Sequence, residues 1–375
     1  MLVIGLMSGT SLDGVDASLI EINESQGEPQ YIERGFVFVP YKNEIKNKIL
    51  DVSNLETSNV QKICSLNFEL GYIYKEAIEV LLTTTKTNIA DVTFIAMHGQ
   101  TIWHNPDEKD GYFSSTLQIG EPSVLAYAFN KLVISNFRVM DIVAGGSGAP
   151  LVPFVNYILH KSNNMNIALQ NIGGIGNVTY IKKGATVDEV VAFDTGPGNM
   201  LIDMAMKKLY NKEYDDGGTI ALSGKVNEDV LNLLMQDDYL KMPLPKSTGR
   251  EKYNDKFLDT ILKQMHDEPN NDIIATITAY TADTIVYAYQ NYCKEIDKVI
   301  LSGGGAHNNF IVKRIKEKMN IEVEISTESD SYEAFCFGVL GYYTYNHKPS
   351  NMRCVTGSNE NVILGNFTYP PREEK

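Results

Sequence analysis

The chain has 375 residues, of which 43% are hydrophobic and 21% are charged, and its formal net charge is −14. The length favours two domains, because one hydrophobic core seldom serves so many residues. The acidic balance argues against a nucleic-acid partner or an anionic membrane surface, since both attract clustered Lys and Arg.

Three further features favour a cytoplasmic protein. No apolar run approaches the ~20 residues that span a bilayer, so we expect no membrane segment. The opening MLVIGLMSGTS lacks a basic region and a small-residue cleavage site, and it is expected to form a strand and not a signal peptide. The four cysteines are far apart and form no C-x-x-C pair, which favours free thiols in a reducing compartment over a disulfide framework or a zinc site.

The first stretch with a functional pattern is GLMSGTSLDGVDASLIEI, from Gly5 to Ile22. Two apolar strands flank small hydroxyl residues and the pair Asp13-Gly14. One interpretation is a β-hairpin closed at Asp-Gly, which is a strong turn signal. The other is a phosphate-binding loop, in which backbone N–H groups and hydroxyls face an anion and a carboxylate lies near a metal ion. The segment alone favours the hairpin.

Strands and helices alternate through the rest of the first half. GFVFVP predicts a third strand that ends at Pro40. Apolar residues on one stripe predict a helix over Ser58 to Leu82. Thr93 to Met97 should form a buried strand that runs into a polar loop, HGQTIWH. KLVISNFRVMDIVAGGSGAP should give another strand, then a charged loop and a run of glycines.

The second half repeats these patterns. MNIALQNIGGIGNVTYI resembles the opening stretch: a strand, a Gly/Asn-rich turn and a second strand. VVAFDTGPGNMLIDMAMKKLY predicts a strand whose end carries Asp194, then a helix with Pro197 near its first turn. DKVILSGGGAHNNFIVKRIKEKM predicts a strand, three glycines, an asparagine cap and a helix. The last apolar helix is SYEAFCFGVLGYY, where Gly338 and Gly341 suggest close helix contact.

This alternation predicts the α/β class. The similar stretches 5–22 and 167–181 indicate two halves built on the same plan. The Gly/Pro stretch Ala144 to Pro150 is the expected boundary. The C-terminal residues are expected to pack back on the first half. We therefore predict one domain from residues 1–148 plus about 350–375, and a second from residues 149–349.

Glycine-rich loops follow three of the predicted strands, at Gly9-Thr10-Ser11, Gly173-Gly174-Ile175-Gly176 and Gly303-Gly304-Gly305. Each alone can be a tight turn. Because ligands bind at the carboxyl ends of strands in open α/β sheets, the three together favour a nucleotide held between two domains. None fits G-x-x-x-x-G-K-[ST], which excludes a P-loop, and none fits G-x-G-x-x-G opening a helix, which argues against a dinucleotide enzyme.

The chain resembles the anhydro-N-acetylmuramic acid kinases, within the superfamily of sugar kinases, actin and heat-shock ATPases. The resemblance runs almost end to end and depends on eight motifs in order: GLMSGTSLDGVD, HGQTIWH, NFRVMDIVAGGSGAPLVP, NIGGIGNVT, FDTGPGN, PKSTGRE, LSGGGAHN and CVTGSNE. The chain departs from the family at Arg353-Cys354 and at Cys336, positions that concern packing more than chemistry.

The resemblance implies two actin-like (ribonuclease H-like) domains around a nucleotide-binding cleft that closes on its ligands, with ATP and Mg²⁺ as cofactors. The family cleaves the 1,6-anhydro bridge of its sugar with water and phosphorylates O6, giving N-acetylmuramic acid 6-phosphate in cell-wall recycling. A homodimer is the family-level expectation. Two alternatives stay open: a kinase for another anhydrosugar such as levoglucosan, and a non-catalytic actin-like nucleotide switch.

Asp194 matches the base of the family, which takes a proton from the water that attacks the anomeric carbon. Its position at the end of an apolar strand suits that role. The alternative is a structural one, an N-cap for Gly196 to Gly198 at the start of the next helix. The basic segment Lys246 to Arg250 matches the family motif but has no assigned role.

The resemblance also assigns nucleotide contacts. Thr10, Ser11 and backbone N–H groups of the opening loop would hold the β- and γ-phosphates. Asp13 would orient Mg²⁺, unless it serves only the Asp-Gly turn, and Asp16 is a further candidate. The complete set of cofactor-binding residues is Gly9, Thr10, Ser11, Leu12, Asp13, Gly14, Val15 and Asp16, with Gly173, Gly174, Gly176 and Asn177 as the second phosphate loop and Gly303, Gly304 and Gly305 in the adenosine loop.

Four residues are assigned to the sugar. Arg138 would contact the sugar or its lactyl carboxylate, for which a guanidinium fork is suited; a structural pair with Asp141 is the alternative. His98 and Gln100 would hydrogen-bond sugar oxygens, or else serve the local structure. Glu333 matches an acidic position of the family site, and its alternative is a carboxylate favoured by a helix N-terminus.

Overall fold

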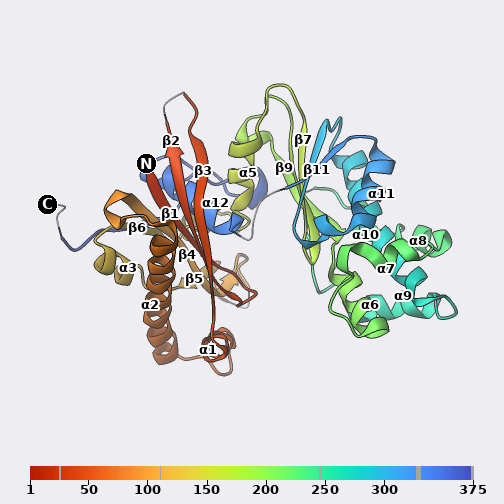
Figure 1. Cartoon of the computed structure of the whole chain (residues 1–375), viewed down its shortest axis with the longest axis horizontal. Helices are drawn as coiled ribbons and strands as arrows, with labels where there is room; N and C mark the ends of the chain where they lie inside the picture. The colour runs from red at the N-terminus through yellow and green to blue at the C-terminus, as the bar shows by residue number, and fades with distance from the viewer. Residues whose placement is uncertain (25–26, 110, 245, 327–330, 373–375) are drawn as a thin grey trace. The chain divides into compact units, whose positions relative to one another are not determined.

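The computed structural model describes residues 1–24, 27–109, 111–244, 246–326 and 331–372. The chain forms two compact units, one of Met1–Val155 with Glu328–Lys375 and one of Asn156–Thr327. Each unit contains one β-sheet with helices against it (Figure 1). The helix α5 (Val152–His160) crosses the division between them.

The first unit contains a seven-stranded sheet in the order β12-β6-β4-β1-β2-β3, with β5 paired to β4. Its strands are β1 (Leu2–Ser8), β2 (Gly14–Asn23), β3 (Gln30–Pro40), β4 (Val92–Asn105), β5 (Ser115–Ile119), β6 (Leu132–Ser135) and β12 (Asn366–Thr368). Its other helices are α1 (Asn43–Ser53), α2 (Val60–Thr85), α3 (Pro122–Phe129), α4 (Val139–Val143), α12 (Tyr332–Tyr345) and α13 (Arg353–Thr356), with a 3-10 turn at Ile89–Asp91.

The second unit contains a five-stranded sheet in the order β11-β10-β7-β8-β9. Its strands are β7 (Ile167–Ile172), β8 (Ile175–Ile181), β9 (Val191–Pro197), β10 (Lys298–Ser302) and β11 (Glu322–Ile325). Its helices are α6 (Met200–Tyr210), α7 (Thr219–Ser223), α8 (Glu228–Leu234), α9 (Asp255–Gln264), α10 (Asn270–Tyr292) and α11 (Asn309–Met319). Its 3-10 helices are η2 (Val187–Glu189), η3 (Asp216–Gly218), η4 (Asp238–Lys241) and η5 (Gly304–His307).

The two sheets share one plan. In each, three strands consecutive in the chain pair antiparallel, and the first of the three then pairs parallel with a later strand: β1 with β4, and β7 with β10. The duplicated α/β plan expected from the sequence is confirmed. In both sheets the first hairpin ends in one of the glycine-rich loops.

The first sheet is covered on both faces. Side chains of a strand alternate between faces, so Ile4 and Leu6 of β1 pack in the buried cluster that includes α2, while Gly5 faces α12. A Cβ on Gly5 would lie 1.9 Å from the Ala334 carbonyl oxygen of α12, and a Cβ on Gly338 would lie 2.1 Å from the Ile20 side chain. The close packing expected at Gly338 is therefore present, but α12 packs there against a sheet and not against another helix.

The observed units differ from the predicted domains in the assignment of α12. The prediction ended the second domain at residue 349, whereas α12 packs against β1, β2 and β4 and belongs to the first unit. The glycines of α12 explain the difference, because their missing side chains let the helix approach the first sheet closely. The C-terminal β12 pairs antiparallel with β6 in the same sheet.

Two local expectations for the first unit were wrong. The polar segment HGQTIWH continues β4 to Asn105 and is not a loop, because it pairs antiparallel with β5. The opening hairpin does not close at Asp13-Gly14: Gly14 already belongs to β2, and the loop spans 9–13 with Leu12 at a φ of +59°. A Cβ at Gly14 would lie 2.3 Å from the Val39 carbonyl oxygen, so strand packing requires this glycine.

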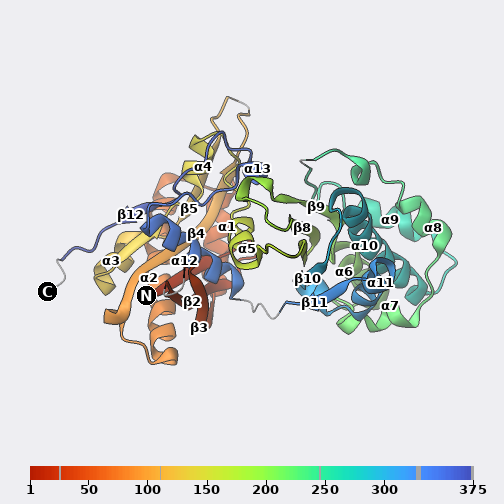
Figure 2. The same cartoon turned by 90° about the horizontal axis from the view of Figure 1, so that it is seen from above.

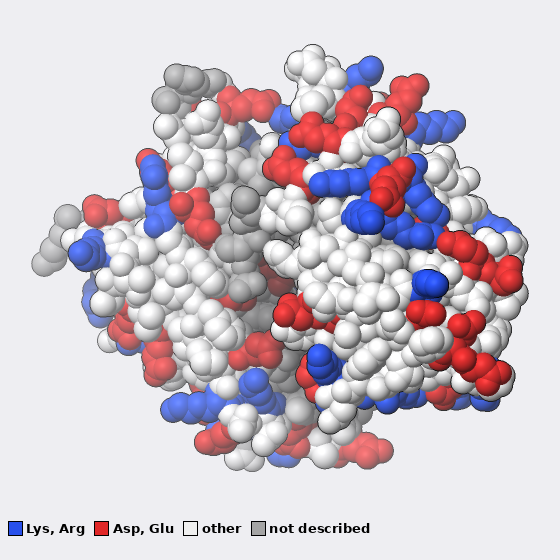
Figure 3. All heavy atoms as spheres, turned by 45° about the vertical axis from the view of Figure 1, so that its right-hand side comes forward, with Lys and Arg blue, Asp and Glu red and all other residues white. Residues whose placement is uncertain are grey.

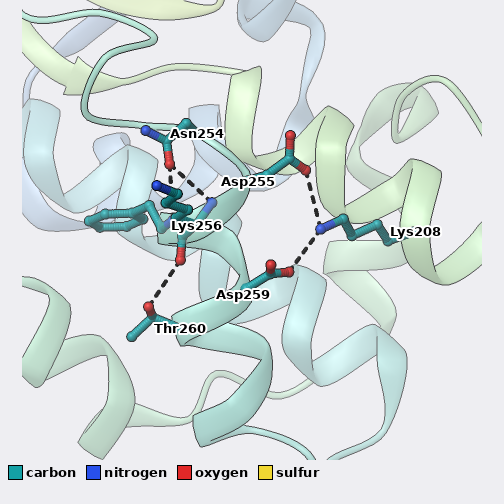
Figure 4. A network of polar contacts seen from close by, with 7 residues as sticks. Lys208, Asn254, Asp255, Lys256, Asp259 and Thr260 are labelled. Carbon is teal, nitrogen blue, oxygen red and sulfur yellow. Dashed lines mark hydrogen bonds and ion pairs between the residues drawn. The ribbon is translucent and has the colours of Figure 1, made fainter.

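The second unit is built around α10, which lies among the other helices of this unit (Figures 1 and 2). The side chains of α10 are buried along most of its length. It packs against α6, α7, α8 and α11. Near the surface, Asn254 caps α9 by accepting hydrogen bonds from the N–H groups of Lys256 and Phe257. Lys208 of α6 pairs with Asp255 and Asp259 of α9, which joins these two helices (Figure 4).

The surface carries charges of both signs. Over the face drawn in Figure 3, Lys and Arg side chains are interspersed with Asp and Glu. Within the part of the chain that the structure describes, none of the helices combines the length and apolar character required to cross a bilayer.

Candidate active site

Asp194 lies in β9, opposite Asn177 of β8. The register then shifts, so that Gly196 faces Gly176 and Thr195 is an extra residue. Such a bulge redirects side chains and is common beside active sites. The carboxylate Oδ2 accepts a hydrogen bond of 3.0 Å from the Thr248 N–H, and the Asp194 carbonyl accepts one of 2.7 Å from the Tyr239 hydroxyl.

The environment of Asp194 makes it more basic than an ordinary aspartate. Partial burial raises the pKa of its carboxyl group, the Thr248 hydrogen bond opposes this, and the nearby Glu251 raises it further. Its carboxylate is a suitable proton acceptor at neutral pH. The activity of a base is lost as pH falls through its pKa, so we expect this loss above the usual aspartate range.

The alternative role of Asp194 as a helix N-cap is not observed. The N–H groups at the start of α6, from Gly198 to Met200, donate instead to the carbonyl oxygens of Gly173 and Gly174 at 2.7–3.1 Å. Pro197, expected in the first turn of the helix, is the last residue of β9. The carboxylate of Asp194 is therefore not used to begin α6.

The second and third glycine loops lie side by side in the second unit. Strands β7 and β10 are parallel, and Asn171 is opposite Ser302 just before the two loops begin. Gly303 has a φ of +77°, and a Cβ on it would lie 2.5 Å from Asn171 Oδ1. The predicted phosphate loop and the predicted adenosine loop thus share the carboxyl edge of one sheet, where ligands of α/β proteins bind.

Three of the loop glycines have no structural requirement within the protein. A Cβ on Gly9, Gly173 or Gly304 would lie at least 3.4 Å from any atom beyond the adjacent residues, and none of the three has a left-handed φ. A side chain would fit there as far as the fold is concerned. We infer that these glycines leave space for a ligand, because absent side chains let the backbone approach an anion closely.

Packing accounts for other glycines that the sequence assigned to the nucleotide. A Cβ on Gly176 would lie 2.7 Å from the Thr195 hydroxyl, and one on Gly305 would lie 2.2 Å from the Ile172 side chain. These positions need glycine whether or not a nucleotide binds. Gly174 is intermediate, with the Met200 side chain 3.4 Å away.

The opening loop presents its polar side chains to solvent. Thr10, Ser11 and Asp13 are exposed. Asp13 lies 3.9 Å from the ammonium group of Lys46. Val15, in contrast, packs fully in the core, so its side chain is not available to a nucleotide.

Gln100 supports the opening loop from behind. It is fully buried, and its Nε2 donates to the Gly9 carbonyl oxygen at 3.2 Å. Because a peptide group is planar and trans, holding this carbonyl turns the Thr10 N–H to the opposite side. Its own Oε1 is buried without a hydrogen-bond partner among the described residues. This placement suits a positioning residue better than the sugar contact expected from the sequence.

Arg138, His98 and Glu333 form a second polar group in the first unit. The Nε–H of Arg138 donates to His98 Nε2 at 2.8 Å, and its Nη1 donates to the Gly148 carbonyl at 2.9 Å. The other ring nitrogen of His98 donates to the Gly99 carbonyl at 2.7 Å, which fixes a neutral tautomer. Burial and the adjacent guanidinium lower the pKa of His98 to about 3, so it stays neutral at physiological pH.

The acidic member of this group is Glu333, in the first turn of α12. Glu333 is exposed, but the surrounding protein partly desolvates its carboxyl group and so raises the pKa of Glu333. The nearby Arg138 guanidinium lowers that pKa. Burial also lowers the pKa of Arg138, and Glu333 opposes that shift. A guanidinium stays charged in proteins, so this group combines one cation, one acid and one neutral imidazole.

The alternative partner of Arg138, Asp141, is occupied elsewhere. The carboxylate of Asp141 is fully buried and accepts hydrogen bonds from the Gly148 N–H, the Asn351 side chain and the Thr356 hydroxyl. No hydrogen bond or ion pair joins it to Arg138 within the described residues. The Nη2 of Arg138 has no hydrogen-bond partner in the same part of the chain, so it is free to bind an anion.

The assigned residues therefore fall into two groups. The opening loop, Gln100 and the Arg138 group belong to the first unit, and Asp194 with the other two glycine loops belongs to the second. Thr248 and Tyr239, which hold Asp194, were not singled out from the sequence. Thr248 lies within the quoted PKSTGRE motif, whereas nothing in the sequence around Tyr239 pointed to it.

The Mg²⁺ ligand assigned from the sequence, Asp13, lies in the opening loop. Among the residues that the structure describes, no group of three or more His, Cys, Asp or Glu side chains could hold a metal ion. A Mg²⁺ ion that binds with a nucleotide does not require such a group of side chains, since it is usually bound by one or two carboxylates together with phosphate oxygens and water. Asp13, exposed beside the open space at Gly9, has the oxygen donors that such a site needs.

Comparison with known proteins gives consistent matches over the whole chain. A sequence model of the family described as anhydro-N-acetylmuramic acid kinase matches residues 1–370. The Clostridioides difficile protein named anhydro-N-acetylmuramic acid kinase is 46% identical over 380 residues, covering 99% of each chain. A Bacillus cereus protein of the same name is 44% identical over 382 residues, covering 99% of this chain and 100% of that one.

Similarity to solved structures is much weaker. Component A of the (R)-2-hydroxyglutaryl-CoA dehydratase of Acidaminococcus fermentans aligns with 90% of this chain and 96% of its own. The identity is 11% and the TM-score is 0.46.

Proposed function

The chain belongs to the anhydro-N-acetylmuramic acid kinase family, and on this premise we propose that it is a cytoplasmic, ATP- and Mg²⁺-dependent sugar kinase. It opens the 1,6-anhydro ring of anhydro-N-acetylmuramic acid with water and phosphorylates O6. The products are N-acetylmuramic acid 6-phosphate and ADP. The observation that carries the proposal is the carboxylate of Asp194 beside the β9 bulge, half-buried, more basic than usual and not used as a helix cap.

Asp194 starts the reaction by removing a proton from water. The oxygen of that water forms a bond to C1 of the sugar while the bond between C1 and O6 breaks. The Thr248 N–H holds the carboxylate at 3.0 Å and fixes its orientation. A base in such a position contributes about 10²–10⁴-fold to the rate.

Phosphoryl transfer follows from the same event. The O6 atom leaves C1 as a developing alkoxide and attacks the γ-phosphorus, and the bond from that phosphorus to ADP breaks. The loops at Gly9, Gly173 and Gly304 would bind the nucleotide through backbone N–H groups. Mg²⁺, when bound at Asp13, would neutralise charge on the phosphates.

The Arg138 group would recognise the sugar. The lactyl substituent of muramic acid is a carboxylate, and a guanidinium binds a carboxylate through paired hydrogen bonds. Arg138 is partly buried and has Nη2 available, so such a contact would form away from bulk water. Glu333 would accept hydrogen bonds from sugar hydroxyl groups. Both ring nitrogens of His98 are already occupied, by the Gly99 carbonyl and by Arg138, so His98 would orient the guanidinium and not contact the sugar.

Incubation of the protein with ATP, Mg²⁺ and anhydro-N-acetylmuramic acid in ¹⁸O-labelled water tests the proposal. We expect one ¹⁸O atom at C1 of a sugar that is phosphorylated at O6. Label absent from C1 would remove the base mechanism. A sugar without the lactyl group turning over equally well would favour another anhydrosugar kinase, and slow ATP hydrolysis without a phosphosugar would favour a nucleotide switch.

The open glycines give the first mutational prediction. Gly9→Ala and Gly173→Ala should each weaken ATP binding about tenfold or more, since the added methyl group occupies the ligand's space, which calorimetric titration can measure. The free energy of unfolding should change by less than about 1 kcal/mol, because neither φ nor space within the protein opposes alanine.

Gly5→Ala is the matched control for these variants. Its Cβ would meet the Ala334 carbonyl at 1.9 Å, so we expect a loss of about 1–3 kcal/mol or more in unfolding free energy. Denaturant titration separates the two kinds of glycine. Unchanged ATP affinity in stable Gly9→Ala and Gly173→Ala variants would contradict the assignment of these loops to the nucleotide.

A further inference from the structure

Lys246 has an unusual environment for a lysine. Only 6% of its surface is exposed. Its ammonium group lies 4.3 Å from the ring centre of Tyr292, 4.9 Å from that of Tyr239 and 5.4 Å from that of Phe193. It donates to the carbonyl oxygens of Leu240 at 2.9 Å and Tyr239 at 3.4 Å. No carboxylate lies within ion-pair distance of it among the described residues.

Burying an ammonium group without a carboxylate is expensive in free energy. Three aromatic faces and two carbonyl oxygens offset part of this cost, because the negative face of each ring attracts the cation. A methionine would fill the same apolar space without that cost. The stability of the fold alone therefore does not explain a charged group here. The explanation lies in the residues that the buried ammonium group contacts.

The cage around Lys246 is built from the neighbours of Asp194. Phe193 precedes Asp194 in β9, and the Tyr239 hydroxyl donates to the Asp194 carbonyl at 2.7 Å. The Asp194 N–H is 3.5 Å from the Lys246 carbonyl oxygen. Two residues after Lys246, the Thr248 N–H donates to the Asp194 carboxylate.

We propose that Lys246 is a positioning residue for the Asp194 carboxylate: three aromatic rings and two carbonyl groups hold its ammonium, and this fixes the segment whose Thr248 amide donates to that carboxylate. The proposal rests on the proposed function in taking Asp194 as the base. It gives the PKSTGRE motif a role that is based on contacts.

Titration of Lys246 makes the arrangement sensitive to alkaline pH. Burial lowers the pKa of Lys246 to about 8, opposed by Asp237. The ammonium is charged below that pH and becomes neutral as pH rises through it, so its attraction to the rings is then lost. Tyr239 and Tyr292 stay neutral in this range because burial raises the pKa of both. Asp237, the charged group that opposes the shift of Lys246, is itself paired with Lys252 at 2.7 Å.

Lys246→Met tests the proposal with a readout that does not depend on catalysis. The carboxyl group of Asp194 is titrated by ¹³C NMR in the wild type and the variant, and the signal is assigned by its loss in Asp194→Asn. Because the Thr248 hydrogen bond lowers the pKa of Asp194, we expect its weakening to raise that pKa by about half a unit or more. An unchanged titration in a folded Lys246→Met protein would overturn the proposal.

Kinetics give the second readout. In Lys246→Met we expect kcat for the muramic substrate to fall about tenfold, with KM for ATP unchanged and the acid limb of the pH profile moved upward. Lys246→Arg keeps a cation at high pH and should retain activity above pH 8, where the wild type declines. A wild-type pH profile and kcat in Lys246→Met would overturn the proposal.

Lys161→Met is the matched control, because that lysine also lies over an aromatic ring, 5.8 Å from the centre of Tyr157, but follows α5 and is outside the segment 246–248. It should leave both readouts unchanged, and equal effects in both variants would count against a specific role of Lys246. The NMR result also separates this proposal from the proposed function. If the wild type has no kinase activity but the pKa of Asp194 depends on Lys246, only the proposed function is refuted.

Discussion

Asp194→Asn abolishes nearly all sugar phosphorylation: we expect kcat to fall about 10²–10⁴-fold, the contribution of a positioned general base. Asparagine has the same shape and keeps an oxygen that can accept from the Thr248 N–H, so the local structure should persist. The amide cannot take a proton from water. The measurement is release of the phosphosugar with ATP and sugar saturating, beside ATP affinity by calorimetry, which should stay within about twofold.

The matched control is Asp238→Asn. Asp238 is an exposed aspartate in η4, next to the tyrosine that bonds the Asp194 carbonyl. Asp238→Asn removes the same charge but leaves the Asp194 carboxylate in place, so kcat should stay within about twofold of the wild type. Asp194→Asn with more than about a tenth of wild-type activity would show that another group is the base.

The sequence indicates Asp194 for a reason that is local. An apolar run of four residues, Val190 to Phe193, precedes the aspartate, and Thr, Gly and Pro follow it, which predicts a carboxylate at the end of a strand. In the structure β9 continues past Asp194 to Pro197. The same reasoning places the three glycine loops at strand ends. The shared edge of β7 and β10 then follows from the duplicated α/β plan.

What the sequence does not indicate depends on partners that are distant in the chain. The composition of HGQTIWH predicts a polar loop, but the segment pairs with β5, which begins only at Ser115. That pairing buries Gln100 behind the opening loop, whereas the family resemblance implied a sugar contact. Local patterns do not specify such pairs, because strand pairing depends on tertiary context.

The cage of Lys246 is a second example. Its rings come from β9, η4 and α10, and no periodicity joins these three segments. The sequence shows a basic segment, for which a solvated surface loop is the ordinary interpretation. Only the fold shows that its lysine is buried and that the amide of Thr248, two residues later, bonds the proposed base.

Arg138→Ala should reduce kcat/KM selectively for the sugar that carries a lactyl carboxylate. Removing one partner of a buried, hydrogen-bonded charge pair costs about 2–5 kcal/mol, which corresponds to about 30-fold to several thousand-fold. The substrates to compare are anhydro-N-acetylmuramic acid and 1,6-anhydro-N-acetylglucosamine, which lacks the lactyl group. The second should lose far less, because it has no carboxylate to leave unpaired.

The variant also removes the hydrogen bonds to His98 and Gly148, so its fold must be checked independently. Arg34→Ala is the control: Arg34 forms an exposed ion pair with Glu21, a type worth about 0–1 kcal/mol, and both sugars should react as with the wild type. Equal losses on the two sugars in a stable Arg138→Ala protein would show that the guanidinium organises the site without reading the lactyl group. A ratio that changes by a hundredfold or so assigns the carboxylate to Arg138, since a structural defect cannot distinguish sugars that differ only in that group.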